Sequence, residues 1–248
     1  MEKATVGVLG IGEVGSSISS IFAKKFKVLK KDLNFDQIKN SKLDVLHVCI
    51  PYDDNFVKNV TSQIKKNKPS LTVIHSTVKP GTTNNLFKKT KVLIVHSPVM
   101  GTHPNLKNDL LLFTKIIGPQ NKKAAQAAQN HFRQAKIKTV LFKSPTESEL
   151  AKLLDTTYFA WNILFNKYVK KMCDDLDLDF DNVYVKFNQI YNRGYKKIRP
   201  NVTRPVLNYM DGPIGGHCVV PNTQILDKFF PSGITSFIID YDKNLKGS

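Results

Sequence analysis

The feature that most constrains this chain is a short apolar segment that runs directly into three spaced glycines. Residues 5–9 read Thr-Val-Gly-Val-Leu, and Gly10, Gly12 and Gly15 follow before a stretch with helical spacing. A strand, a Gly-x-Gly-x-x-Gly turn and a helix are typical of dinucleotide-binding folds, because the glycines allow a tight turn and let a pyrophosphate approach the helix N-terminus. Asp32 lies 22 residues after Gly10, near the spacing of ~20 for a residue that binds a ribose hydroxyl.

Up to residue 143 the chain alternates short apolar runs with amphipathic stretches, which predicts strand–helix units around a parallel sheet. We therefore expect an α/β, doubly wound (Rossmann) domain over residues 1–143. The expected strands are Thr5–Leu9, Lys27–Lys31, Val45–Ile50, Leu71–His75, Val92–His96, Lys115–Ile117 and Lys138–Phe142. The expected helices are Ser16–Lys25, Asp54–Lys66, Thr82–Lys88 and Lys122–Ala135.

From Ser144 to about Asp174 the apolar residues advance by three and four, which predicts one long helix. Its cap is Ser144, or Thr146 with Glu149 as its partner. At roughly 40 Å such a helix is longer than one sheet requires, so we expect it to start a second, mainly helical module over residues 144–248 and to form a homodimer interface. The segments expected next are a helix that Asp181 caps and that runs to about Tyr191, a loop over 192–216, a short helix over 222–229 and an apolar stretch over 234–239.

The chain carries 37 Lys plus Arg against 20 Asp plus Glu, a net charge of +17. The lysines occur in scattered pairs instead of one stripe, which argues against a nucleic-acid partner and favours attraction of small anions. Without a long apolar run or a leader, we expect a soluble, cytoplasmic protein with no membrane partner. The three cysteines lack metal-binding spacing, so we expect free thiols and no metal.

A carboxylate at Asp32 favours NAD over NADP, because it binds a 2′-hydroxyl and repels a 2′-phosphate. Lys30 and Lys31 favour NADP instead, since binding of a 2′-phosphate needs positive charge. The alternative is that these two lysines point to solvent. The predicted cofactor contacts are Gly10, Ile11, Gly12, Glu13, Val14, Gly15, Asp32, Pro51 and Thr77.

Two further motifs narrow the prediction. Residues 76–83 read Ser-Thr-Val-Lys-Pro-Gly-Thr-Thr, and residues 212–218 read Gly-Pro-Ile-Gly-Gly-His-Cys. With the glycine turn and the helix that begins at Glu149, they resemble the UDP-glucose/GDP-mannose dehydrogenase family of NAD-dependent nucleotide-sugar 6-dehydrogenases. The Gly-Gly-His-Cys form is most similar to members that act on N-acetylated UDP-sugars. The resemblance covers about residues 4–229, and we expect the family's C-terminal nucleotide-sugar-binding domain to be absent.

The resemblance implies three catalytic roles. Cys218 matches the nucleophile that captures a sugar aldehyde as a thiohemiacetal, Lys152 matches the lysine that stabilises the oxyanion, and Thr77 matches a threonine that helps position water. Each position also has a simpler interpretation: a buried cysteine, a solvated lysine and a capping threonine.

The chain departs from the family at the positions that organise hydrolytic water. Val99 and His103 replace two glutamates, Thr156 replaces an asparagine, and Asn222 replaces an aspartate. His103 can accept a proton near neutrality or merely fill its loop, and His217 is the other candidate. An amide cannot act as a base, so thioester hydrolysis is in question.

These patterns predict an NAD-dependent dehydrogenase that oxidises an alcohol of a sugar or sugar derivative. The alternatives are a two-electron dehydrogenase or reductase of a small hydroxyacid-like substrate, and a non-catalytic NAD-binding sensor or partner protein.

Overall fold

A computed structural model describes residues 3–102, 104–215 and 218–247. The chain forms two compact units, residues 1–152 and 153–248, and the division falls inside one long helix. The boundary expected at residues 143 and 144 rests on sequence patterning and stays a prediction.

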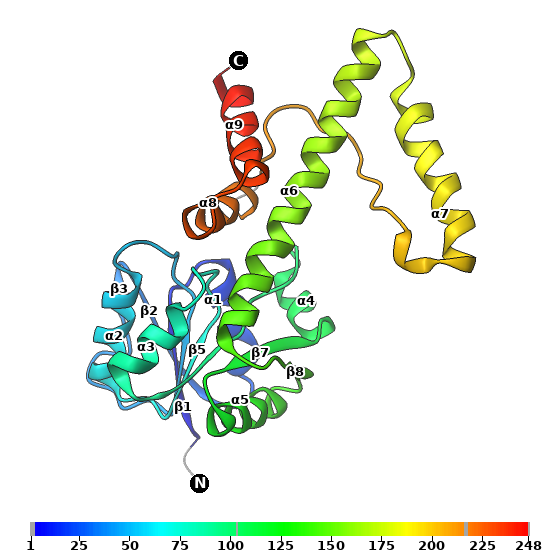
Figure 1. Ribbon diagram of the computed structural model, residues 1–248. Helices are drawn as coiled ribbons and strands as arrows, with labels where there is room; N and C mark the ends of the chain where they lie inside the picture. The colour runs from blue at the N-terminus through cyan, green and yellow to red at the C-terminus, as the bar shows by residue number, and fades with distance from the viewer. Residues whose placement is uncertain (1–2, 103, 216–217, 248) are drawn as a thin grey trace. The chain divides into compact units, whose positions relative to one another are not determined.

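Unit 1 contains an eight-stranded sheet in the order β3-β2-β1-β4-β5-β6-β7-β8 (Figure 1). Most neighbouring strands are parallel, which confirms the expected doubly wound α/β class, but β2–β3 and β6–β7 are antiparallel. The two-residue β3 was not predicted because so short a segment carries no periodicity. The strands are β1 Thr5–Leu9, β2 Lys27–Asp32, β3 Phe35–Asp36, β4 Val45–Val48, β5 Leu71–Ile74, β6 Leu93–His96, β7 Lys115–Pro119 and β8 Thr139–Leu141.

Helices cover both faces of the sheet, because the central strands are apolar on both sides. Helices α1 (Glu13–Phe22), α4 (Leu106–Leu112) and α5 (Lys122–Gln134) contribute to one core cluster. Helices α2 (Phe56–Asn67) and α3 (Thr82–Thr90) contribute to the other. The short helix α4 was not predicted.

The long helix is α6, Pro145–Asp175. The Ser144 hydroxyl accepts the Glu147 N–H at 3.2 Å, and the Glu147 carboxylate accepts the Lys143 N–H at 2.8 Å. Ser144 is therefore the cap, and the alternative pairing of Thr146 with Glu149 is wrong. Glu149 is instead turned toward the start of α3.

The described elements of unit 2 are helices, with a loop over residues 203–215, and they correct three expectations. Asp179, not Asp181, caps the segment after α6, because its carboxylate accepts the N–H groups of Asp181 and Asn182. The expected loop begins only after Ile198, because the helix continues to that residue. Within this helix the ring centroids of Tyr191 and Tyr195 lie 4.4 Å apart. The apolar stretch after residue 233 is a helix. The elements are the π-helix Asp181–Lys186, α7 Phe187–Ile198, the 3₁₀ turn Pro200–Val202, α8 Val219–Phe229 and α9 Gly233–Gly247.

A chain of hydrogen-bonded histidines crosses the core of unit 1. His47 Nδ1 lies 2.8 Å from His75 Nε2, and His47 Nε2 lies 2.9 Å from His131 Nε2. His75 Nδ1 lies 2.9 Å from the Ser97 carbonyl oxygen. Because that oxygen only accepts, His75 carries its proton on Nδ1, and the remaining bonds place the His47 proton on Nδ1 and the His131 proton on Nε2. All three rings are thus satisfied in the neutral form.

Burial lowers the pKa of each of these histidines, to about 4 for His131. No group of three or more His, Cys, Asp or Glu side chains among the described residues is arranged to hold a metal ion. In the same part of the chain, no helix is long and apolar enough to cross a membrane.

Candidate active site

The glycine turn after β1 has the geometry that a pyrophosphate requires. Gly10 has a φ of +89°, where residues with a side chain are strained, and a Cβ on Gly15 would lie 1.8 Å from the Gly10 carbonyl oxygen. A Cβ on Gly12 would meet nothing within 4 Å. Gly12 is also the N-cap of α1, which begins at Glu13. The backbone at Gly12 is therefore open to an approaching phosphate at the positive end of a helix, so the residues present fit a dinucleotide.

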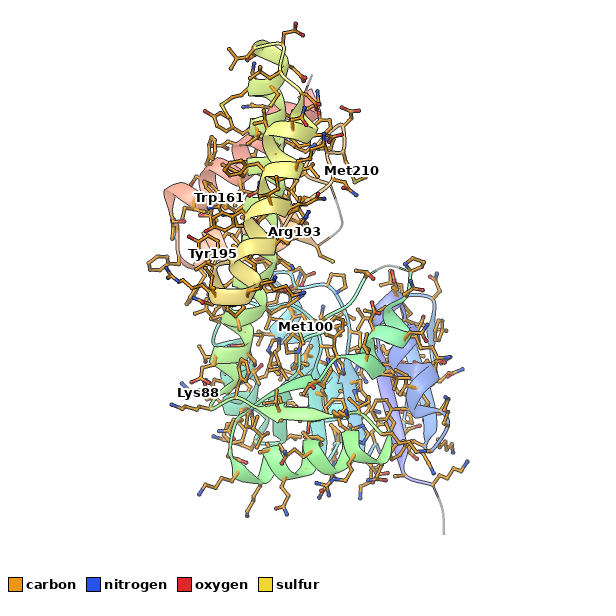
Figure 2. The ribbon with its side chains drawn as sticks, turned by 90° about the vertical axis from the view of Figure 1, so that its right-hand side faces the viewer. Lys88, Met100, Trp161, Arg193, Tyr195 and Met210 are labelled. Atoms are coloured by element: carbon orange, nitrogen blue, oxygen red, sulfur yellow. The ribbon has the colours of Figure 1, made fainter. Side chains whose placement is uncertain are left out.

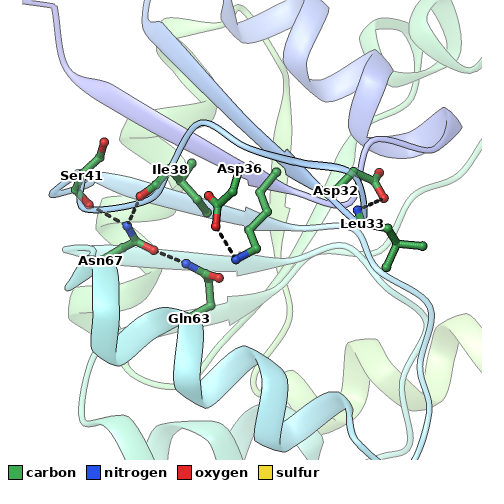
Figure 3. A network of polar contacts seen from close by, with 8 residues as sticks. Asp32, Leu33, Asp36, Ile38, Ser41, Gln63 and Asn67 are labelled. Carbon is green, nitrogen blue, oxygen red and sulfur yellow. Dashed lines mark hydrogen bonds and ion pairs between the residues drawn. The ribbon is translucent and has the colours of Figure 1, made fainter.

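Asp32 stands at the end of β2 and faces this turn. Its carboxylate accepts the Ile11 N–H at 2.5 Å. It also accepts the Leu33 N–H at 2.7 Å, a bond that Figure 3 shows. These two bonds, that to Ile11 first, lower the pKa of Asp32, so it is ionised at neutral pH. Lys31 forms an ion pair with Asp36 of β3 at 2.6 Å, which engages one of the two lysines that could favour a 2′-phosphate.

The ends of β4 and β5 complete this edge of unit 1. The strand order reverses between β1 and β4, and ligands of open α/β sheets bind at such a point. Pro51 is exposed shortly after β4, and Thr77 is partly buried after β5. The Ser76 hydroxyl donates to the Ile50 carbonyl at 2.6 Å, which ties the two loops together.

The segment after β6 carries the two positions, Val99 and His103, at which the resembled family has glutamates. Val99 packs partly buried against the core cluster, and His103 lies outside the described residues. The Lys115 ammonium donates to the carbonyls of Ser97 and Pro98 at 2.8 and 2.6 Å. Burial lowers the pKa of Lys115 to about 7. This buried lysine was missed by sequence reasoning, because a single Lys at the start of an expected strand looks like a solvent-exposed residue.

Lys152 and Thr156 lie one turn apart on α6, on either side of the division between the units. Lys152 is partly buried in unit 1. In unit 2, Thr156 is buried and its hydroxyl donates to the Leu153 carbonyl at 3.1 Å.

Cys218 is an exposed free thiol at the N-cap of α8. Its exposure differs from the buried, inert cysteine considered as its simpler interpretation. Its carbonyl accepts the N–H of Asn222, whose side chain is buried one turn later. Cys49, in contrast, lies just after β4, and burial raises the pKa of its thiol to about 12. Gly216 and His217, which precede Cys218, lie outside the described residues.

Comparison with known proteins finds similarity to dehydrogenases of nucleotide sugars. No family model matches the chain. It is 24% identical over 242 residues to a UDP-N-acetyl-D-mannosamine dehydrogenase of Methanocaldococcus jannaschii, covering 86% of this chain and 54% of that protein. The fold is similar to that of a UDP-D-ManNAc dehydrogenase from Pyrococcus horikoshii, with a TM-score of 0.81 at 17% identity over 98% of this chain and 69% of the other. The chain is similar to nucleotide-sugar dehydrogenases over part of their length.

These relatives confirm the resemblance predicted from the motifs. The chain spans about half the length of the curated relatives it matches. The fold is also shared with a 3-hydroxyisobutyrate dehydrogenase from Mycobacterium tuberculosis, at a TM-score of 0.75 and 12% identity, over all of this chain and 95% of that one.

Proposed function

We propose that this relative of the nucleotide-sugar dehydrogenases is an NAD-dependent oxidoreductase that oxidises an alcohol group of a sugar or sugar derivative. The observation that carries the proposal is the glycine turn, open at Gly12 and faced by the ionised Asp32. The names of the relatives support a nucleotide-sugar substrate, and the net charge of +17 suits an anionic one.

In this proposal the turn from Gly10 to Gly15, with Ile11, Glu13 and Val14, holds the pyrophosphate at the start of α1. The Asp32 carboxylate accepts from the 2′-hydroxyl of the adenine ribose, and Pro51 and Thr77 contact the dinucleotide from the neighbouring loops. When bound, the nicotinamide ring supplies the hydride acceptor.

The chain's own residues then handle charge and protons. The Lys152 ammonium donates to the reacting oxygen and stabilises its negative charge, and His103 or His217 takes up the proton. The thiolate of Cys218, exposed at a helix N-terminus, adds to the carbonyl carbon of an aldehyde product, and the carbonyl oxygen is protonated as the C–S bond forms. Because Val99, Thr156 and Asn222 replace the groups that organise water, with Thr77 alone retained, hydrolysis from the enzyme is slow.

Turnover of NAD with a panel of sugars and nucleotide sugars tests this proposal. We expect reduction of NAD with at least one nucleotide sugar, loss of about 3–4 kcal/mol of transition-state stabilisation in Lys152→Ala, and added mass on Cys218 in the intact protein during turnover. An active Lys152→Ala protein would show that the active site is misplaced. Binding of NAD without any turnover would favour the sensor alternative.

A two-electron dehydrogenase of a small hydroxyacid-like substrate is the second candidate. It is favoured by the fold shared with 3-hydroxyisobutyrate dehydrogenase over both units. It is also favoured by Asn222, which cannot act as a base. In that case Cys218→Ala retains substantial activity, no adduct accumulates, and hydroxyacids replace sugars as substrates.

We also propose that the protein is a homodimer through residues 147–172 of α6. Side chains on this helix leave a large apolar surface exposed within unit 2: Leu154, Tyr158, Phe159, Trp161, Phe165, Tyr168 and Met172 (Figure 2 labels Trp161). So much aromatic surface favours a protein partner. The three free thiols support a reducing, cytoplasmic compartment.

A further inference from the structure

The first turns of α6 are anchored to the segment 76–83 by buried polar contacts. Glu149 has no exposed surface, and its two carboxylate oxygens accept the N–H groups of Gly81 and Thr83 at 2.6 and 2.8 Å. These donors belong to the N-cap and the first turn of α3, for which Gly81 provides no side-chain cap. A carboxylate from another helix therefore supplies the cap of α3 and meets the positive end of its dipole.

A second contact holds the other end of the same segment. Ser148, also fully buried, lies with its hydroxyl 2.8 Å from His96 Nδ1, and His96 Nε2 lies 3.2 Å from the Ser76 carbonyl oxygen. A third contact follows just beyond, where the Asn84 amide donates to the Thr146 hydroxyl at 3.3 Å. One end of the segment that carries Thr77 is thus bonded directly to α6, and the other end is linked to α6 through His96.

The attachment point is three residues before Lys152. Residues three apart lie on neighbouring positions of one helix face, so rotation or sliding of α6 would move Lys152 and the 76–83 segment together. The buried carboxylate is costly unless both oxygens are paired, and here two backbone donors from the segment pair them. Among these contacts Glu149 is the one that makes two hydrogen bonds to the segment's backbone.

We propose that Glu149 is a positioning residue, which sets the conformation of the segment 76–83 against the helix that carries Lys152. This inference rests on the proposed function for the roles of Thr77 and Lys152. The inference goes beyond the proposed function because it names the side chain that fixes the position of Thr77 relative to Lys152.

The test compares Glu149→Gln with Glu147→Gln. Both remove one carboxylate from the first turns of α6, but the hydrogen bond that Glu147 accepts among the described residues comes from the Lys143 N–H, outside the segment. A Gln at 149 keeps one acceptor and turns an NH₂ donor toward the other N–H. We expect amide exchange of a peptide over residues 76–86 to accelerate at least tenfold in Glu149→Gln, with peptides from β1 and α1 unchanged and no effect in Glu147→Gln.

Kinetics supply the second measurement. We expect kcat to fall at least tenfold in Glu149→Gln while the Kd for NAD stays within twofold, since the glycine turn and Asp32 are untouched. If Glu149→Gln does not fold, Glu149→Asp, which keeps the charge on a shorter side chain, should show the same split in milder form. Unchanged exchange over 76–86, or parallel losses of kcat, NAD affinity and thermal stability, would overturn the inference. If the wild-type protein turns over none of the substrates, the proposed function fails, and the exchange measurement alone decides whether Glu149 orders the segment.

Discussion

Asp32 and Lys31 are neighbours at the end of β2 with opposite charges and different partners. Asp32 faces the glycine turn, whereas Lys31 is paired with Asp36. A carboxylate facing a 2′-phosphate repels it by about 1–4 kcal/mol at surface-like dielectric. We therefore expect calorimetric titration to show that NAD binds more tightly than NADP.

The lysine provides the control for this prediction. Because Lys31 is engaged by Asp36, Lys31→Ala should leave the affinity for NADP unchanged within twofold, while Asp32→Ala should narrow the difference between the two dinucleotides. Tighter binding of NADP by the wild-type protein would assign the 2′-phosphate to the lysines instead.

We expect an added methyl group to affect stability at one glycine of the turn and NAD affinity at another. In Gly15→Ala the new Cβ would overlap the Gly10 carbonyl oxygen, so we expect a loss of unfolding free energy at the upper end of about 1–3 kcal/mol in urea titration. In Gly12→Ala the Cβ meets open space, so stability should change little while NAD affinity falls at least tenfold. Equal effects of the two variants on stability would contradict the geometry.

At the scale of single elements, α6 has two chemically different faces in unit 2. Leu153, Ala160 and Leu164 are buried, whereas Tyr158, at 61% exposure, and Phe165, at 49%, are open within the chain. We expect the wild-type protein to sediment as a dimer at micromolar concentration. A Tyr158→Glu, Phe165→Glu double variant should sediment as a monomer, because the buried charges are not compensated.

The matched control for the dimer is Leu112→Glu. Leu112 is a large apolar residue with 77% exposure at the end of α4, so its replacement should leave the oligomeric state unchanged. A wild-type monomer at micromolar concentration would remove the proposed interface.

At the scale of the whole molecule, four buried histidines make unit 1 sensitive to acid. Burial lowers the pKa of His47 and His75 well below 6.5, that of His131 to about 4 and that of His96 to about 3. Between pH 6.5 and about 4 the unfolded chain binds protons that the folded one does not, so stability is full above pH 6.5 and is lost as the pH falls. Below pH 6.5 each such group contributes at most about 1.4 kcal/mol per pH unit.

Urea titration between pH 7.5 and 5 checks this expectation. The unfolding free energy of unit 1 should fall steeply over that range. His131→Gln, whose amide can still donate to His47, should reduce the slope by about 1.4 kcal/mol per pH unit. A protein as stable at pH 5 as at pH 7.5 would contradict the neutral, buried state of the histidines.

Local patterns sufficed to predict much of this molecule. Residues close together in the chain predicted the glycine turn, the seven strands other than β3 and the span of α6. Turn geometry and hydrophobic periodicity act over a few positions, so they can be recognised without the rest of the fold. The same holds for the placement of Asp32 at a strand end and for Ser144 as one of two possible caps of α6. The roles of Cys218 and Lys152 follow from motif resemblance and stay predictions.

Other features exist only where distant segments meet. Glu149 caps α3 through a donor 68 residues away, and His131 bonds His47 across 84 residues. The assembly of the sheet likewise decides that β7 runs antiparallel to β6. It also decides that Lys115 is buried and donates to the Ser97 and Pro98 carbonyls, which follow β6. The sequence by itself determined the local elements and the chemistry available to the dinucleotide turn. Tertiary structure decided which polar groups are buried and paired, because burial and hydrogen-bond partners belong to pairs of segments and not to either segment alone.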